Sequence, residues 1–299
     1  MPSLYVLDVG HGNSTVLKDT AGTIVVDAGP KSGLLDFLIS HEIYEIDVLL
    51  LSHADMDHIG GAIALLMSDE IEIKKVCLNS DSTKGSTVWN DLLYALYNSH
   101  KSGELEFEPA LTTHLSGKLN QGMVNVEIMA PNQYIVSKGP GSTDNKGRKL
   151  TTNSISAVIR LSCEQNHVAL LPGDIDQIGL DNLFQDHDDA RAWILVYPHH
   201  GGKSGVGDVR EFANNLSKKV QPRIVVFSIR ENIKDFPNRD VIESIEQALD
   251  EVSMLTTRSS EVFADFIKES NNELHKDCVG NIALDLERFP PGVIFSALK

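Results

Sequence analysis

The 299-residue sequence predicts a layered α/β protein with two β-sheets. Short apolar runs that suit strands recur in both halves of the chain, and segments with helical spacing accompany each set. With 41% hydrophobic and 23% charged residues, the composition is that of a globular protein with a large core. Because no fixed-period repeat and no Pro-rich or Gly/Ser linker divides the chain, we expect one domain over residues 1–299.

In the first half, glycine-containing turns separate the apolar runs, as in Gly10-His11-Gly12 and Asp27-Ala28-Gly29. Strands are expected at residues 4–9, 14–17, 23–26, 46–51 and 76–79, and helices at 34–39, 59–67 and 87–99. Residues 139–153 are rich in Gly, Ser, Thr and Asn and are expected to form a long loop.

The second half repeats the strand-rich pattern with a more polar end. Strands are expected at residues 156–162, 167–171, 193–197, 223–228 and 281–286, and a helix at 239–252. The polar residues 257–277 are expected to be a helical insertion. We therefore expect insertions into the single domain near residues 80–150 and 257–278.

Composition excludes several classes of protein. The formal net charge of −16 disfavours a non-specific coat on nucleic acid and a binder of anionic membranes, although a bound metal can make one site locally cationic. The chain has no run of 18 apolar residues and no signal-peptide pattern at its start. Its cysteines, Cys77, Cys163 and Cys278, are far apart, which argues against a disulfide framework or a thiolate zinc site. We expect a cytoplasmic protein with no membrane association.

The densest chemical signal is the run His53-Ala54-Asp55-Met56-Asp57-His58, directly after an apolar strand. Four side chains that bind metals lie within six residues. The alternative is a solvated acidic turn, but histidine is too rare for two to fall often beside two aspartates by chance. The run therefore predicts a metal site at a strand end.

Two further clusters follow apolar strands in the same way. Asp174 follows Leu170-Leu171-Pro172-Gly173, and His199 and His200 follow the strand that ends near Tyr197. Each cluster alone is typical of a turn or a helix cap. Since strand ends on one side of a sheet converge, the three clusters together predict one site.

The segment HADMDHIGG resembles the HxHxDH signature of the metallo-β-lactamase fold superfamily, with Asp55 where the second histidine usually stands. With LDVGHGN, IVVDAG, LLPGD and PHHGG, the chain is similar to the soluble hydrolase domain of the competence DNA-uptake protein ComEC and its stand-alone relatives. The likeness runs from Leu7 to about Gly202 and continues more weakly to Leu286. It implies a four-layer αββα sandwich with a metal site at one edge of the two sheets.

The resemblance also implies two divalent metal ions and their ligands. The implied ligands are His53 and Asp55 for one ion, Asp57 and His58 for the other, Asp174 as a bridge, and His200, preferred over His199, as the later histidine. Asp27 matches an aspartate that supports the metal loop. Zn²⁺ is the first choice, and the carboxylate of Asp55 shifts preference toward Mn²⁺ or Mg²⁺.

Two departures from the family pattern leave alternatives open. Phe236 stands where relatives often have a histidine before proline, and the usual histidine between the first and last motifs is missing, with Asn153 and Ser154 the nearest candidates. A one-metal enzyme or an inactive relative stays open. His11 lies in a glycine-rich turn and either lines the edge of the site or is structural.

The expected function is metal-dependent hydrolysis of phosphodiesters in nucleic acid or nucleotides, with metal-bound hydroxide as the nucleophile and Asp57 and Asp174 as catalytic residues. Residues 138–149 carry four basic side chains against Asp144 alone, so this loop would clamp a phosphate backbone, or it is a solvated surface loop. The expected substrate-binding residues are Lys203, Asn153, Ser154, Lys146 and Arg148.

Two other functions stay open. One is hydrolysis of carboxylic esters, lactones or amides at the same metals. The other is an effector or interaction subunit of a larger assembly, such as an antiviral defence system, with a protein partner and a degenerate or partner-activated site. Phe236 and the polar residues 257–277 motivate the second alternative.

Overall fold

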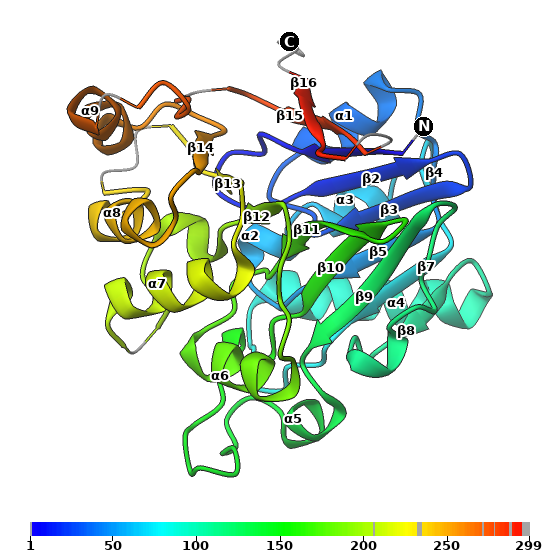
Figure 1. Cartoon of the computed structure of the whole chain (residues 1–299). Coiled ribbons are helices and arrows are strands. Elements are labelled where there is room, and N and C mark those ends of the chain that lie inside the picture. The colour runs from blue at the N-terminus through cyan, green and yellow to red at the C-terminus, as the bar shows by residue number, and fades with distance from the viewer. Residues whose placement is uncertain are drawn as a thin grey trace.

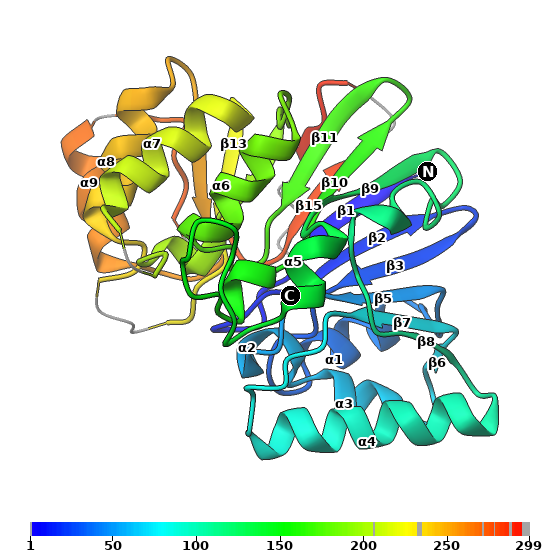
Figure 2. The same cartoon turned by 90° about the horizontal axis from the view of Figure 1, so that it is seen from below.

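The computed structural model describes residues 2–205, 207–231, 235–270, 272–277, 279–286 and 289–294. Two β-sheets pack face to face, and helices cover the outer face of each (Figures 1 and 2). The chain thus has the four-layer αββα architecture of the metallo-β-lactamase fold, as the sequence predicts.

The first sheet carries the N-terminal half of the chain and is closed at one edge by the C-terminal strands. Its order is β16 (Gly292–Ile294), β15 (Ile282–Asp285), β1 (Ser3–Val6), β2 (Thr15–Asp19), β3 (Gly22–Val26), β5 (Val48–Leu51), β7 (Lys75–Leu78) and β8 (Glu106–Glu108). Neighbours from β16 to β3 are antiparallel, and those from β3 to β8 are parallel.

The second sheet has the same mixed character. Its order is β14 (Ser253–Thr256), β13 (Ile224–Phe227), β12 (Ile194–Val196), β11 (Asn166–Leu171), β10 (Val158–Cys163) and β9 (Val124–Ala130). Strands β9 to β11 are antiparallel neighbours, whereas β11 to β14 are parallel. Parallel strands bring their carboxyl ends to one edge, where loops hold functional side chains.

The helices divide between the two outer faces (Figure 2). The first sheet packs against α1 (Gly33–Ser40), α3 (Ala62–Leu66) and α4 (Thr87–Ser102), and the second against α6 (Gln177–Asp186), α7 (Val209–Val220), α8 (Arg239–Ala248) and α9 (Glu261–Ser270). The shorter elements are α2 (Met56–Ile59), α5 (Gln133–Lys138), the single turns η1 (Thr113–Leu115), η2 (Asn153–Ile155) and η3 (Pro198–Gly201), and the small pair of β4 (Glu45–Ile46) with β6 (Glu72–Ile73).

Strand β5 shows why the central strands are apolar throughout. Leu50 is buried in the core between the sheets with Ile159 of β10, while Leu49 and Leu51 are buried against the helices. Successive side chains of a strand point to opposite faces, and both faces of this sheet are covered. The continuous apolar run before His53 follows from that double burial.

Most expected elements are present with shifted ends, and three expected boundaries are wrong. The strand expected at 46–51 divides at Asp47, whose carboxylate accepts a hydrogen bond from the backbone N–H of Thr23 at 2.8 Å. The helix expected at 59–67 divides into α2 and α3 at Gly60-Gly61, since glycine favours a helix poorly. The helix expected at 239–252 ends at Ala248 because the chain continues as β14.

The two expected insertions contribute to the layers. Residues 80–150 supply α4 and β8 to the first half of the sandwich and β9 to the second. Only residues Glu261–Ser270 of the segment 257–277 form a helix, α9. Among the described residues, Cys77 and Cys163 are free and buried, and Cys278 lies outside them. No helix in the described ranges combines the length and apolar character needed to cross a bilayer.

Candidate metal centre

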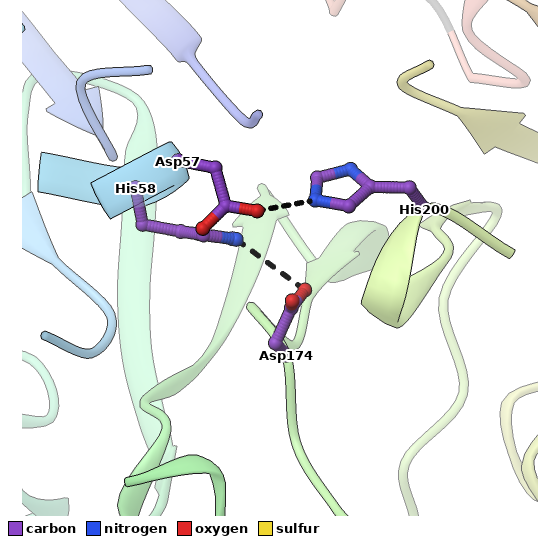
Figure 3. A group of neighbouring side chains, drawn as sticks. All are labelled: Asp57, His58, Asp174 and His200. Atoms are coloured by element: carbon purple, nitrogen blue, oxygen red, sulfur yellow. Dashed lines mark hydrogen bonds and ion pairs between the residues drawn. The ribbon is translucent and has the colours of Figure 1, made fainter. Parts of the chain in front are cut away.

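The three strand-end clusters meet at one edge of the sandwich. Asp57 and His58 lie in α2 after β5, Asp174 follows β11, and His200 lies in η3 after β12. One ligand atom from each of these four side chains lies within 4.8 Å of those of the other three. Figure 3 shows the four side chains pointing toward one another from three parts of the chain, with Asp57 and His58 on the same short helix. We call this group the four-residue position.

Within this group, each histidine faces a carboxylate. His200 Nε2 lies 3.3 Å from Asp57 Oδ2, and His58 Nε2 lies 3.4 Å from Asp174 Oδ1 (Figure 3). The other nitrogen of each ring is already committed: His58 Nδ1 lies 2.7 Å from Asp27 Oδ2, and His200 Nδ1 lies 2.8 Å from the carbonyl oxygen of Ser228. Both partners only accept hydrogen bonds, so each Nδ1 carries a proton.

The position of the proton on each histidine ring shows whether a cation fits between the histidines and the carboxylates. In a neutral imidazole with a proton on Nδ1, Nε2 carries a lone pair of electrons. In that tautomer of His58 and of His200, this lone pair would face a carboxylate oxygen. Two acceptors at this distance repel unless a proton or a metal ion lies between them. The buried Nε2 atoms of His53 and His58 also have no hydrogen-bond partner among the described residues. The donor set therefore fits a divalent metal ion.

The remaining implied ligands lie beside the four-residue position. His53 Nε2 lies 3.6 Å from Asp55 Oδ2, and the rings of His53 and His58 are 4.1 Å apart between centroids. His199 Nδ1 lies 3.5 Å from Asp174 Oδ2, the carboxylate oxygen that does not face His58. Asp174 Oδ1 also accepts a hydrogen bond from the backbone N–H of His199 at 2.8 Å, so both carboxylate oxygens of Asp174 have partners in the site. We call His53 and Asp55 the neighbouring position.

Electrostatics keep the carboxylates ionised. Burial alone would raise the pKa of Asp174, but the neighbouring His58 and His200 hold it well below the usual range. Burial also opposes ionisation of Asp57, yet the contacts with His200 and His58 lower its pKa to about 2. For His58, burial favours the neutral ring, and Asp174 and Asp27 outweigh it and raise its pKa. Without a metal ion, a proton on His58 compensates part of this buried negative charge.

Asp27 lies behind the site and fixes its geometry. Its buried carboxylate follows β3 and accepts hydrogen bonds from the backbone N–H of Ser52 at 2.7 Å, the Ser52 hydroxyl at 2.9 Å and His58 Nδ1. Asp27 therefore ties the end of β3 to the loop after β5 and sets the tautomer of His58. Its φ of 62° is in the left-handed region, which aspartate tolerates better than most residues.

The loop before Asp174 is as tightly constrained. Gly173 has a φ of +54°, and a Cβ at this position would lie 2.3 Å from Ser156 Oγ and 2.6 Å from Ser52 Oγ. The same Ser156 hydroxyl accepts a hydrogen bond from the backbone N–H of Asp174 at 3.0 Å. The glycine allows the two sheets' loops to approach closely, and the serine fixes the backbone at Asp174.

The expected substrate-binding residues differ in their solvent exposure and in their hydrogen-bond and ion-pair partners. Lys203 and Lys146 are exposed, whereas Ser154 is buried and donates a hydrogen bond to Asp176 at 2.7 Å. Asn153 is half-buried at the start of η2. The guanidinium of Arg148 pairs with Asp144 and Asp181, so a phosphate would have to compete with two carboxylates for it. The roles assigned to these residues stay predictions.

Two residues beside the metal ligands have no strong sequence signal. His11 Nε2 lies 3.8 Å from Asp57 Oδ2, and its ring lies 4.4 Å from that of His200 and 5.8 Å from that of Phe236. The sequence left His11 between the site edge and a structural role, and the structure places it at the edge. Lys84, in the loop between β7 and α4, contacts Asp55 through its ammonium. A lone lysine in a polar loop carries no motif, so sequence reasoning missed it.

Comparison with known proteins agrees with this arrangement. A family model described as the metallo-beta-lactamase superfamily matches residues 7–68, the segment that contains Asp27 and the run from His53 to His58. The ComE operon protein 3 of Bacillus subtilis (strain 168) is 24% identical over 266 residues, which cover 81% of this chain. They cover 30% of that protein, so the chain corresponds to less than a third of its length.

Two solved structures share the fold at low sequence identity. Tm1679, described as a metal-dependent hydrolase of the beta-lactamase superfamily, is 15% identical with a TM-score of 0.53, over 86% of this chain and 96% of its own. Zn²⁺-bound PqqB from Methylobacterium extorquens is 9% identical with a TM-score of 0.51, over 96% of this chain and 100% of its own. These likenesses establish the fold, and the matched segment adds the run from which the site is built. The chain therefore has the metallo-β-lactamase fold, and its residues 7–68 are similar to the model of the metallo-beta-lactamase superfamily.

Proposed function

We propose that this chain is a metal-dependent hydrolase of phosphodiester bonds, with nucleic acid or a nucleotide as its substrate. One observation carries the proposal: at the four-residue position, Nε2 of each of two histidines is directed at an aspartate oxygen, and Nδ1 of each ring faces another acceptor. Such a mixed set of imidazole and carboxylate donors suits the divalent ions that activate water.

We propose two ions, one held by Asp57, His58 and His200 and the other by His53 and Asp55, with Asp174 between them. Imidazole ligands favour Zn²⁺, and the carboxylates also suit Mn²⁺ or Mg²⁺. When bound, such ions lower the pKa of water to about 7 and stabilise the attacking and leaving oxygens of a displacement at phosphorus. The zinc in PqqB supports Zn²⁺ as the first choice.

The chain's own residues would orient this chemistry. Asp27 and the carbonyl of Ser228 hold the two histidine rings with Nε2 toward the site. Asp174 is 6% exposed and so offers its oxygens inward, whereas the Asp57 side chain is 26% exposed and faces the mouth. His11 lies between Asp57 and Phe236 at the rim, where it would contact a bound substrate.

We favour a phosphodiester over an uncharged ester because the ammonium of Lys84 lies beside Asp55 and would attract a phosphate. Lys84 contacts Asp55, and Lys203 is exposed directly after η3. The resemblance to the hydrolase domain of the competence DNA-uptake proteins favours nucleic acid. The net charge of −16 opposes long-range attraction of a polyanion, so recognition would depend on these local charges and on the metal ions.

The test is a comparison of bis-p-nitrophenyl phosphate with p-nitrophenyl acetate and a lactone, using protein loaded with Zn²⁺ or Mn²⁺. We expect metal-dependent cleavage of the phosphodiester, lost in Asp57→Ala and Asp174→Ala and kept in Asp188→Ala, a control at an exposed aspartate. Circular dichroism checks that each variant is folded. Turnover of the acetate or the lactone without turnover of the phosphodiester would replace the proposal with the acyl-bond alternative.

A further inference from the structure

The neighbouring position already contains a cation supplied by the chain. The ammonium of Lys84 contacts Asp55 Oδ1, while Asp55 Oδ2 faces His53 Nε2 at 3.6 Å. The Lys84 and Asp55 side chains are 28% and 30% exposed, so water screens this pair only in part. One carboxylate oxygen is thus held by an ammonium and the other is directed at a histidine.

The loop that carries Lys84 is anchored to the rest of the site. The buried carboxylate of Asp81 accepts hydrogen bonds from the backbone N–H of Thr83 at 2.8 Å, from the Thr83 hydroxyl at 2.6 Å and from the hydroxyl of Thr152. Thr151 in turn donates a hydrogen bond to Asp176 at 2.8 Å, close to Asp174 in sequence. Lys84 therefore extends from a loop that Thr152 ties to the segment before β10.

In the part of the chain that the structure describes, no lysine or arginine pairs with the carboxylates of the four-residue position. Among the described residues, the ion-pair partners of the Asp57 and Asp174 carboxylates are histidines, which become neutral when they bind a metal ion. Lys84, by contrast, brings an ammonium into contact with Asp55 at the neighbouring position. The two positions therefore differ in how much fixed positive charge an incoming ion meets.

We propose that Lys84 controls the occupancy of the neighbouring position. Its ammonium neutralises Asp55 and repels a divalent ion there, so the chain binds one ion tightly at the four-residue position and a second one more weakly. The inference rests on the proposed metal site and adds an order of binding to it. When the second ion enters, Asp55 keeps one oxygen on Lys84 and offers the other beside His53, so Lys84 acts as a positioning residue.

The test measures metal binding directly, without substrate. Apo protein is titrated with Zn²⁺ and with Mn²⁺ by calorimetry, and the metal content is measured after desalting. For the wild type we expect one ion per chain to survive desalting and a second binding event that is clearly weaker. In Lys84→Met the second ion should bind at least about tenfold more tightly, equivalent to about 1.4 kcal/mol, and survive desalting.

Two further variants separate charge from structure. Lys84→Arg keeps the positive charge and should bind metal as the wild type does. Lys75→Met is a matched control, because Lys75 pairs with Glu106, is similarly exposed at 22%, and lies at the other end of β7. This control should leave both binding events unchanged, and circular dichroism checks the fold of each variant.

The outcomes distinguish this inference from the proposed function. Equal affinities for both ions in the wild type, or a second affinity in Lys84→Met within twofold of wild type, would overturn the role of Lys84. Absence of any metal binding in folded protein would overturn the metal site itself and with it this inference. Ordered binding that Lys84→Met alters, without phosphodiester cleavage, would support the role of Lys84 and reject only the proposed substrate.

Discussion

Replacing Asp27 tests whether a residue that binds no metal sets the metal affinity. Its carboxylate accepts three hydrogen bonds from Ser52 and His58 in a buried setting. Asp27→Ala leaves those donors unpaired, at about 1–3 kcal/mol for each buried group, and places alanine at a positive φ at a cost of about 1 kcal/mol. Allowing for relaxation and water entry, we expect the apo protein to lose about 4 kcal/mol of unfolding free energy.

The sharper variant is Asp27→Asn, which keeps the shape of the side chain and its tolerance of a positive φ. Its amide oxygen can still accept from Ser52, but the negative charge beside His58 is lost and the ring is no longer held in one tautomer. Loss of such outer partners typically weakens metal binding by about 10–100-fold. We expect a loss in this range for the first ion.

Two measurements check this prediction. Urea unfolding of the apo protein, followed by the fluorescence of Trp89 and Trp193, gives the stability of each variant. Zinc titration against a competing chelator gives the affinity for the first ion. If Asp27→Asn is folded and binds zinc within twofold of wild type, the orientation of His58 by Asp27 does not govern the site, and the argument from tautomers is wrong.

Three other predictions follow from the packing. Gly173→Ala should lower stability by about 2 kcal/mol or more and weaken metal binding, because its Cβ would overlap two serine hydroxyls, whereas Gly85→Ala, with open space around it, should change unfolding in urea by less than about 0.5 kcal/mol. Leu50→Ala, in the core between the sheets, should cost about 3 kcal/mol in the same assay, and a loss below 1 kcal/mol would contradict its central position. Burial raises the pKa of Cys77 to about 12 from 9.0, so the folded state holds this proton more tightly than the unfolded state. The stability advantage of wild type over Cys77→Ala is therefore complete below pH 9 and should fall by about 1.4 kcal/mol per pH unit above it, and a constant difference from pH 8 to 10.5 would contradict the raised pKa.

The residues of the candidate metal centre were predictable because their positions follow from local sequence. Both faces of β5 are buried, so the run before His53 is apolar. Histidine and aspartate residues directly after such a run are easily recognised in the sequence. The same holds for Asp174 after β11 and His200 after β12, and parallel neighbours such as β11 and β12 end at the same edge. The division of these residues between two ions came from the resemblance to the family and stays a prediction.

Elements on the sheet edges were harder to predict than those in the centre. Strand β8 is short and charged, with the sequence Glu-Phe-Glu, because its neighbour on one side is β7 and the other side is an edge. Strand β9 alternates apolar and polar residues only over its first part, and it too ends a sheet. The pattern that identifies a buried strand weakens where burial is incomplete.

Lys84 was not predictable for a different reason. Its place beside Asp55 depends on the link between Asp81 and Thr152, which are 71 residues apart, and no local pattern encodes such a pair.

The contact between Lys84 and Asp55 also bears on substrate binding. Asp55, Asp57 and Asp174 bring three negative charges to the mouth of a chain whose net charge is already −16. Lys84 offsets one of them, and two divalent ions would offset more charge than a proton on His58 does, so a phosphate should bind well only after the metals do. The affinity for an inert phosphodiester analogue should therefore rise with metal loading, and equal binding by apo and loaded protein would contradict this electrostatic account.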